Sequence, residues 1–200
     1  MPDTPRAYIV DDDSAALKSL LALLRARRID AKGFSSGEEF LKEYDLRWCG
    51  CAILDVRMPG MSGIELLAEL KEMGSSLSVI LVTAYGDVSL AVEAMKAGAI
   101  DFLEKPYSQE ELLAALVRGF DVGDAAARKS EMRADAREKL EKLTNREKEV
   151  LELLAQGMTS KEIAQQFGRS PRTVEVHRNR IREKTGAQSL SDLVRLIGAA

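Results

Sequence analysis

The chain has 200 residues, of which 46% are hydrophobic and 30% are charged, with a formal net charge of −3. This length allows one large or two small domains, and the composition is ordinary for a globular protein. No apolar run approaches the roughly 18–20 residues that cross a membrane, and the first residues lack a secretory signal. We therefore expect a cytoplasmic protein with no membrane partner.

Charge is distributed unevenly along the chain. Residues 1–120 have a net charge of −6, residues 121–143 are neutral, and residues 144–200 have a net charge of +3. An acidic first part and a basic last part indicate two modules. The basic module suits an acidic partner such as DNA.

Short apolar runs alternate with amphipathic stretches in the first 120 residues. The runs lie at 7–10, 31–34, 51–56, 79–83 and 102–103. Each run precedes residues with helical apolar spacing, as in Leu17, Leu20 and Leu24 after the first run. Five strand–helix pairs predict a parallel sheet covered by helices on both faces, with right-handed crossovers.

Chemically active side chains follow the predicted strands. Asp11 and Asp12 come after the first strand, Asp55 ends the third, Thr83 ends the fourth, and Lys105 follows the fifth. Because the carboxyl ends of parallel strands meet at one edge of a sheet, we expect these groups to converge. One such Asp is usually a helix cap or a solvated turn residue, but the full set is hard to explain that way. Neighbouring carboxylates favour Mg²⁺, and Asp55 can then act as a nucleophile toward a phosphoryl group.

Residues 5–120 resemble the receiver domain of two-component response regulators, through the segments YIVDDD, LDVRMPGMSG, VTAYGD and AVEAMKAGAIDFLEKP. The resemblance implies an α/β, flavodoxin-like (βα)5 fold with parallel strand order 2-1-3-4-5. It makes Asp55 the phosphoacceptor, Thr83 and Lys105 the phosphoryl contacts, and Phe102 an aromatic switch that changes rotamer when Thr83 moves. It assigns Mg²⁺ to a set of oxygen ligands, namely Asp11, Asp12, Asp55 and the backbone carbonyl of Arg57.

The predicted domain bounds are 1–120 for the receiver domain, 121–139 for a linker and 140–200 for the last domain. The linker is Ala-rich and evenly charged. We predict that it is helical, with a mobile linker as the alternative. The apolar stripe that includes Met132 and Ala136 is too sparse to predict a dimeric coiled coil.

Only helices are predicted from residue 144 onward. Thr144 with Glu147, and Thr159 with Glu162, form capping boxes that begin two of them. Ser170 caps a third, Arg-rich helix that has Pro at its first position, and a fourth runs over about 189–197. The second and third helices form a helix-turn-helix pattern. Charge alone leaves open a solvated basic helix in an ordinary bundle.

Residues 140–197 are similar throughout to the LuxR-type DNA-binding domain of NarL/FixJ-family regulators, over LTNREKEVLELLAQGMTSKEIAQQFGRSPRTVEVHRNRIREKTGAQSLSDLV. The resemblance implies an all-α four-helix domain that binds DNA as a dimer. The base-facing positions are Glu175, Val176 and Asn179. The candidates for DNA backbone contacts are Lys161, Ser170, Arg172, Thr173, His177, Arg178 and Lys184. The dimerisation positions are Leu190, Leu193 and Val194.

Together these features predict a response regulator that is not a turnover enzyme. A partner histidine kinase would phosphorylate Asp55 with Mg²⁺ as cofactor, and the phosphoryl group would favour an active, dimeric state. That homodimer, formed on phosphorylation or on DNA, would bind double-stranded promoter DNA and control transcription, with RNA polymerase as a further candidate partner. The alternatives are an Asp-nucleophile phosphatase and a constitutive DNA-binding protein whose receiver only supports dimerisation.

Overall fold

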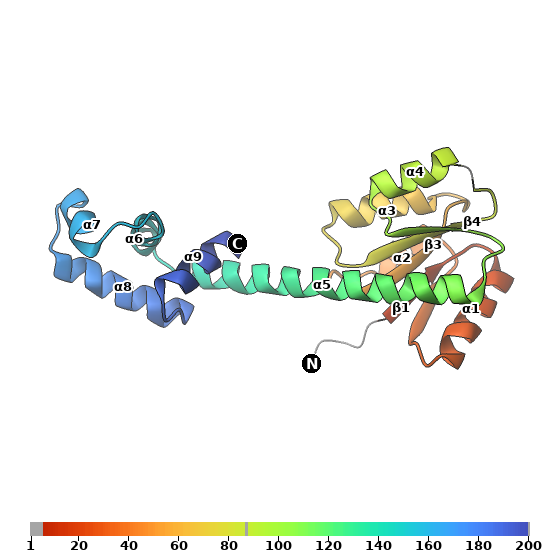
Figure 1. Ribbon diagram of the computed structural model, residues 1–200, viewed down its shortest axis with the longest axis horizontal. Helices are drawn as coiled ribbons and strands as arrows, with labels where there is room; N and C mark the ends of the chain where they lie inside the picture. Colours follow the sequence, from red (N-terminus) through yellow and green to blue (C-terminus); the bar gives the residue numbers. More distant parts are fainter. Residues whose placement is uncertain (1–5, 87, 200) are drawn as a thin grey trace. The chain divides into compact units, whose positions relative to one another are not determined.

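The computed structural model describes residues 6–86 and 88–199. The chain divides into two compact units, Met1–Arg128 and Lys129–Ala200. The first unit combines a sheet with helices, and the second contains helices (Figure 1). None of the helices built from the described residues has both the length and the apolarity needed to cross a membrane.

The sheet of the first unit is parallel, with the order β2-β1-β3-β4-β5. This confirms the flavodoxin-like strand order predicted from the sequence. The strands are β1 (Arg6–Val10), β2 (Ala31–Phe34), β3 (Gly50–Asp55), β4 (Ser78–Thr83) and β5 (Asp101–Glu104). In the register, Val10 pairs with Leu54, and Asp55 pairs with Val82. The carboxyl ends of β1, β3 and β4 therefore lie at one edge of the sheet.

Helices cover both faces of this sheet. They are α1 (Ser14–Ala26), α2 (Gly37–Glu43), α3 (Gly63–Glu72), α4 (Val88–Ala97) and the first part of α5 (Gln109–Glu141). Helices α1 and α5 pack on one face, and α2, α3 and α4 pack on the other (Figure 1). Side chains alternate along β1, so Ile9 belongs to the first core layer and Val10 to the second.

Glycines allow α5 to approach β3 closely. A Cβ atom at Gly123 would lie 2.2 Å from the carbonyl oxygen of Gly50, and one at Gly119 would lie 2.5 Å from Sγ of Cys51. Ser78 ties the same elements together by donating to the carbonyl oxygens of Gly119 at 2.8 Å and Gly50 at 3.2 Å. A larger side chain at either helix position would force α5 away from the sheet.

The second unit contains the four helices that the sequence predicted from residue 144 onward. They are α6 (Asn145–Ala155), α7 (Ser160–Gln166), α8 (Pro171–Thr185) and α9 (Leu190–Ala199). Both predicted capping boxes are present, and Ser170 caps α8 by accepting from the Thr173 N–H. The helices enclose a separate core whose buried residues include Val150, Leu154, Ile163, Val174, Ile181 and Leu193.

Helix α5 includes all of residues 121–139, the segment predicted as a linker. The division between the two units falls inside this segment, after Arg128. Ala136 is buried, and Leu140 and Leu143 pack in the core of the second unit. The last turns of α5 thus belong to the second unit, whereas the predicted bounds gave residues up to 139 to the linker.

Candidate functional site

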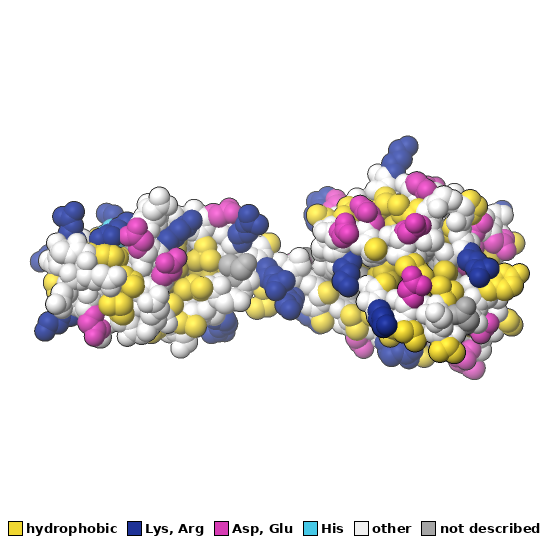
Figure 2. Space-filling view, turned by 90° about the horizontal axis from the view of Figure 1, so that it is seen from above, with side chains coloured by type: hydrophobic (Ala, Val, Ile, Leu, Met, Phe, Trp, Pro, Cys, Tyr) yellow, Lys and Arg dark blue, Asp and Glu magenta, His cyan; other side chains and the backbone are white. Residues whose placement is uncertain are grey.

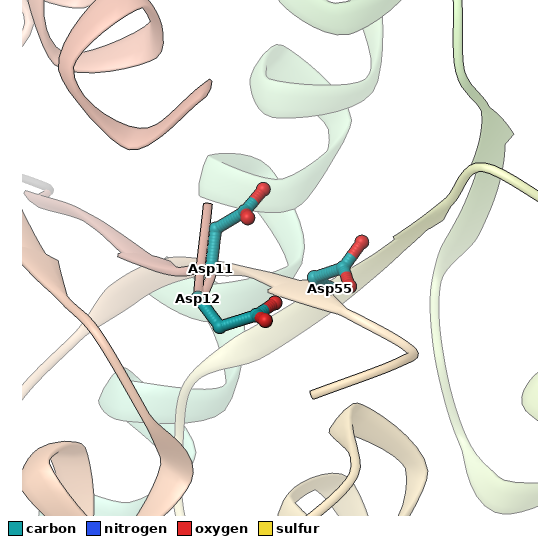
Figure 3. Close-up of side chains that lie close together, drawn as sticks. All are labelled: Asp11, Asp12 and Asp55. Atoms are coloured by element: carbon teal, nitrogen blue, oxygen red, sulfur yellow. The ribbon is translucent and has the colours of Figure 1, made fainter. Parts of the chain in front are cut away.

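Three carboxylates meet at the carboxyl edge of the sheet. Asp11 and Asp12 follow β1, Asp55 ends β3, and one carboxylate oxygen from each lies within 4.8 Å of the others. Figure 3 shows these side chains close together, projecting from the ends of the two strands. Asp11 and Asp55 are only 4% and 6% exposed, whereas Asp12 faces solvent. The arrangement is an acidic pocket with one open side.

Lys105 supplies the positive charge that faces this pocket. Its Nζ donates to Oδ2 of Asp11 at 2.8 Å and to Oδ1 of Asp55 at 2.9 Å. The lysine follows β5, 50 positions after Asp55 and 94 after Asp11. These distant residues meet because β1, β3, β4 and β5 pair side by side in one parallel sheet.

The loop after Asp55 is built to hold that carboxylate in place. The Arg57 N–H donates to Oδ2 of Asp55 at 3.1 Å. A Cβ atom at Gly63 would lie 2.3 Å from the Asp55 carbonyl oxygen, so only glycine allows α3 to begin this close to β3. Glu38, at the start of α2, accepts from the Met61 N–H at 3.0 Å and anchors the outer part of the loop.

Burial and charge shift two protonation equilibria in the pocket. Burial, together with the nearby charge of Asp11, raises the pKa of Asp55, and the bonds from Lys105 and the Arg57 N–H oppose this rise. Burial by itself would lower the pKa of Lys105, but its bonds to Asp11 and Asp55 raise it above its ordinary value. The lysine therefore stays charged, and a further cation would favour the ionised form of Asp55.

The donor set fits Mg²⁺. It consists of carboxylate oxygens on a partly open edge. The backbone carbonyl of Arg57, whose N–H donates to Asp55, stays a predicted further ligand. Mg²⁺ prefers oxygen ligands and keeps several waters, which the exposed Asp12 side of the pocket accommodates. Asp11, Asp12, Asp55 and Arg57 are thus the residues that would hold the ion.

Thr83 lies at the same edge, and its hydroxyl is bonded to the loop that follows β4. The side chain is fully buried, with Oγ1 accepting from the Tyr85 N–H at 3.2 Å and donating to the Tyr85 carbonyl at 3.5 Å. The Arg57 guanidinium lies over the Tyr85 ring at 4.7 Å, so this loop also contacts the loop after Asp55. Phe102 on β5 is partly buried against the core beside α3 and α4.

Helix α8 carries most of the predicted DNA-contact residues of the second unit. Val174 and Ile181 anchor one side of α8 in the core. Several other side chains are exposed, namely Arg172, Thr173, Glu175, Val176 and Asn179. Lys161 on α7 and the cap residue Ser170 are also exposed, at the start of their helices. Figure 2 shows Lys and Arg side chains distributed around this unit.

Several of the predicted DNA-contact residues have partners within the unit or a buried atom. Lys184 Nζ donates to Oε2 of Glu147 at 2.6 Å, so any contact with a DNA phosphate would compete with this ion pair. Arg178 Nη1 donates to the side chains of Ser160 and Glu175. Nδ1 of His177 is buried and makes no hydrogen bond with the described residues.

The three predicted dimerisation residues differ in burial. Leu193 is 5% exposed and packs in the core of the second unit, whereas Leu190 and Val194 are exposed. Leu193 therefore contributes to the core of the unit, whereas Leu190 and Val194 present apolar side chains to solvent.

Sequence reasoning missed two structural roles. Asp13, the third acid of the DDD run, caps α1 by accepting from the Ala15 and Ala16 N–H groups. Its position directly before the first helix was a local signal for this role. The ion pair between Glu147 and Lys184 joins α6 to α8 across 37 positions, and no local pattern predicts it.

Comparisons with known proteins agree with this geometry. Residues 7–117 match the response regulator receiver domain, and residues 141–197 match the luxR family of bacterial regulatory proteins. The chain is 41% identical to the transcriptional regulatory protein FixJ of Azorhizobium caulinodans, over 98% of this chain and 93% of FixJ. It is 39% identical to the response regulator protein TodT of Pseudomonas putida, over 94% of this chain and 83% of TodT.

A solved structure extends the likeness to the fold. The response regulator StyR matches with a TM-score of 0.84 and 37% identity, over 98% of this chain and 99% of that chain. Proteins that combine these two domains regulate transcription and are not turnover enzymes. The receiver domain and the luxR-type domain follow one another in this chain, and the chain belongs to the response regulators of the NarL/FixJ family.

Proposed function

We propose that a partner histidine kinase phosphorylates Asp55 in a Mg²⁺-dependent reaction, and that this phosphorylation controls sequence-specific binding of promoter DNA in the cytoplasm. The observation that carries the proposal is the convergence of three carboxylates with Lys105 at the carboxyl edge of the sheet. A structural ion pair would need only one carboxylate. The exposed side of the pocket leaves a path for a phosphodonor.

In the transfer step, an Asp55 carboxylate oxygen attacks the phosphorus of the phosphodonor. The new bond joins that oxygen to phosphorus, while the bond from phosphorus to the donor nitrogen breaks and its electron pair stays on the nitrogen. Lys105 already bonds to Oδ1 of Asp55 and can stabilise the charge of the phosphoryl oxygens. Bound Mg²⁺ would neutralise negative charge shared by the carboxylates and the phosphoryl group.

Thr83 connects the modification to a change of conformation. Its hydroxyl is bonded to Tyr85 and must leave this partner to contact a phosphoryl group on Asp55. Movement of Thr83 would open space for Phe102, which is partly buried against the core layer beneath α3 and α4. The phosphoryl group favours the state in which Thr83 and Lys105 bind it, so phosphorylation shifts the population toward that state.

DNA binding is proposed for α8 and for the residues around its start. Base contacts are assigned to Glu175, Val176 and Asn179, which are exposed. Contacts with the DNA backbone are assigned to the residues predicted for them from the sequence, namely Lys161, Ser170, Arg172, Thr173, His177, Arg178 and Lys184. Leu190 and Val194 form the exposed apolar face proposed to pair two copies on DNA. RNA polymerase is a proposed later partner of that complex.

The test uses the full-length protein with Mg²⁺, with and without beryllofluoride as a phosphoryl mimic. Molar mass from light scattering and affinity for selected promoter DNA are measured for wild type and Asp55→Asn. We expect beryllofluoride to raise the dimer fraction and tighten DNA binding in wild type only. The same response in Asp55→Asn, or no response in either protein, would contradict the proposal. Omitting Mg²⁺ should abolish the wild-type response.

A further inference from the structure

Three side chains from two helices of the second unit form one hydrogen-bonded cluster. Ser160, the first residue of α7, donates its hydroxyl proton to Oε1 of Glu175 on α8. Arg178, also on α8, donates from Nη1 to the Ser160 hydroxyl at 2.7 Å and to Oε1 of Glu175 at 3.0 Å. Each of the three residues therefore bonds to both of the others, which fixes the rotamers of all three.

The cluster uses only one of the two Glu175 oxygens. Both donors, Ser160 and Arg178, meet Oε1. Within residues 6–86 and 88–199 no hydrogen bond engages Oε2. The Glu175 side chain is 51% exposed, whereas the Arg178 side chain is 29% exposed. The cluster thus holds a carboxylate from its inner side and leaves its outer oxygen for a donor from another molecule.

Charge keeps this carboxylate an acceptor. The Ser160 hydroxyl bond lowers the pKa of Glu175, and the positive charges of Arg178 and Arg182 lower it further. An ionised carboxylate has no proton to donate and can only accept. Glu175 also lies one helical turn before Asn179, on the side of α8 away from Val174 and Ile181. Its free oxygen therefore lies on the face that would meet a DNA groove.

The major groove offers few donors to such an oxygen. Guanine presents only the acceptors N7 and O6 there, thymine presents O4 and a methyl group, and cytosine presents the N4 amino donor. Adenine presents its N6 donor next to its N7 acceptor. The N7 lone pair repels a carboxylate that approaches N6. A carboxylate fixed at one position consequently selects cytosine over the other bases.

We propose that Ser160 is a specificity-determining positioning residue that holds Glu175 so that its free oxygen accepts from a cytosine amino group. The inference rests on the proposed function, because it requires α8 to lie in the major groove. Ser160 itself reads no base in this arrangement. It acts through Glu175, and its removal would let the carboxylate adopt other rotamers and lose its preference, while the phosphate contacts that hold the protein on DNA would remain.

The experiment selects bound sequences from a library of duplexes with a randomised half-site, using the full-length protein with beryllofluoride and Mg²⁺. The proteins compared are wild type, Ser160→Ala, Ser160→Thr, Glu175→Gln, the double variant Ser160→Ala/Glu175→Gln, and Lys161→Ala. Affinity for DNA of unrelated sequence is measured in parallel. Circular dichroism confirms that each variant retains its helices.

We expect wild type to select cytosine at one position of each half-site, by about tenfold over the other bases. Ser160→Ala should flatten that position, while Ser160→Thr, which keeps the hydroxyl, should retain the preference. Glu175→Gln should end the preference for cytosine, because its amide NH2 group would donate rather than accept. The double variant Ser160→Ala/Glu175→Gln should flatten it no further than Glu175→Gln alone. Lys161→Ala, a proposed phosphate contact, should weaken binding to all sequences and leave the preference unchanged.

Three outcomes would overturn the inference in different ways. If Ser160→Ala keeps the wild-type preference at every position, Ser160 has no positioning role, although the DNA-binding function stands. If wild type with beryllofluoride binds every duplex equally, the proposed sequence-specific function fails together with the inference. Equal weakening of all sequences by Ser160→Ala would assign the residue to stability or to phosphate contact, and would also contradict the proposal.

Discussion

The two units place their functional side chains in opposite environments. In the receiver domain, Asp11, Asp55 and Thr83 are nearly or fully buried at the ends of three strands. In the DNA-binding domain, the side chains assigned to DNA are mostly exposed on α7 and α8. The first arrangement concentrates charge in a pocket, and the second spreads it over a surface.

This difference decides how each domain responds to a change. Buried charges interact strongly with one another, so the loss of one group alters the pocket as a whole. Exposed groups are screened by water and salt, and each contributes a small part of the binding. We therefore expect all-or-none effects in the receiver pocket and graded effects on the DNA-binding surface. Buried exceptions in the second domain, such as Glu147, sharpen the comparison.

The largest effect is expected for Asp55→Asn. The amide cannot accept a stable phosphoryl group, so labelling by a small acyl phosphate, followed by intact-protein mass spectrometry, should fall below detection. The fold should be retained, because the substitution removes a buried carboxylate whose pKa burial raises. Urea unfolding measures whether the receiver fold is retained. It is followed by the fluorescence of Trp48, the single Trp of the chain. Residual labelling at another Asp would show that the pocket does not depend on one nucleophile.

A second large effect is expected where α5 packs on β3. Gly123→Ala places a Cβ atom about 2.2 Å from the Gly50 carbonyl oxygen, and a backbone atom cannot move aside. The receiver domain should lose about 3 kcal/mol of unfolding free energy. Gly198→Ala in α9 is the matched control, because its Cβ atom meets nothing within 4 Å. That variant should stabilise the DNA-binding domain by up to about 1 kcal/mol, and the same sign for both variants would contradict this explanation.

The buried ion pair of the DNA-binding domain should behave like the receiver pocket. Glu147 is 2% exposed, accepts from Lys184 at 2.6 Å and from the Thr144 N–H at 2.8 Å, and belongs to the capping box of α6. Glu147→Gln should cost about 2 kcal/mol, since it leaves the lysine without a charged partner. Glu149→Gln removes an exposed pair with Arg146 on the same helix and should cost less than about 0.5 kcal/mol. Thermal unfolding of the helices measures both, and equal effects would refute the role of burial.

The smallest expected effects are changes of unfolding free energy with pH, and these changes should have opposite signs in the two domains. The folded-state pKa of Asp55 lies above its ordinary value of 3.8, so its protonation favours folding. Its contribution is fully present below that value and is lost as the pH rises through the folded-state pKa. Lowering the pH from 7 toward 4 without Mg²⁺ should therefore increase the stability contributed by this site.

Glu147 should respond in the opposite direction. Burial raises its pKa, but the bonds from Lys184 and Thr144 outweigh burial and hold the pKa below the ordinary value of 4.5. Its contribution is present above that value and is lost as the pH falls through the lower folded-state pKa. Urea unfolding of wild type, Asp55→Asn and Glu147→Gln at several pH values isolates the contribution of each carboxylate. If neither variant changes the pH dependence, the two carboxylates do not control it.

Much of the receiver fold could be predicted from the sequence because its signals are local. The buried run that ends at Asp55, the Ser36 cap before α2, and the helical spacing of leucines each act within a few residues. The strand order and the set of pocket residues also came from a resemblance covering most of the chain. The structure bears out that fold, and the roles of the pocket residues remain predictions.

Other features depend on contacts between residues that are distant in the sequence. The sequence identified Leu193 and Lys184 only by position in a motif, and it could not show that Leu193 packs in the core or that Lys184 bonds to Glu147. It also gave no sign that Ser160 meets Glu175 and Arg178 across two helices. Local patterns fix which elements form, because caps and periodicity act within one or two turns. The tertiary structure decides which side chains are buried or paired, because that depends on the neighbour that packing provides.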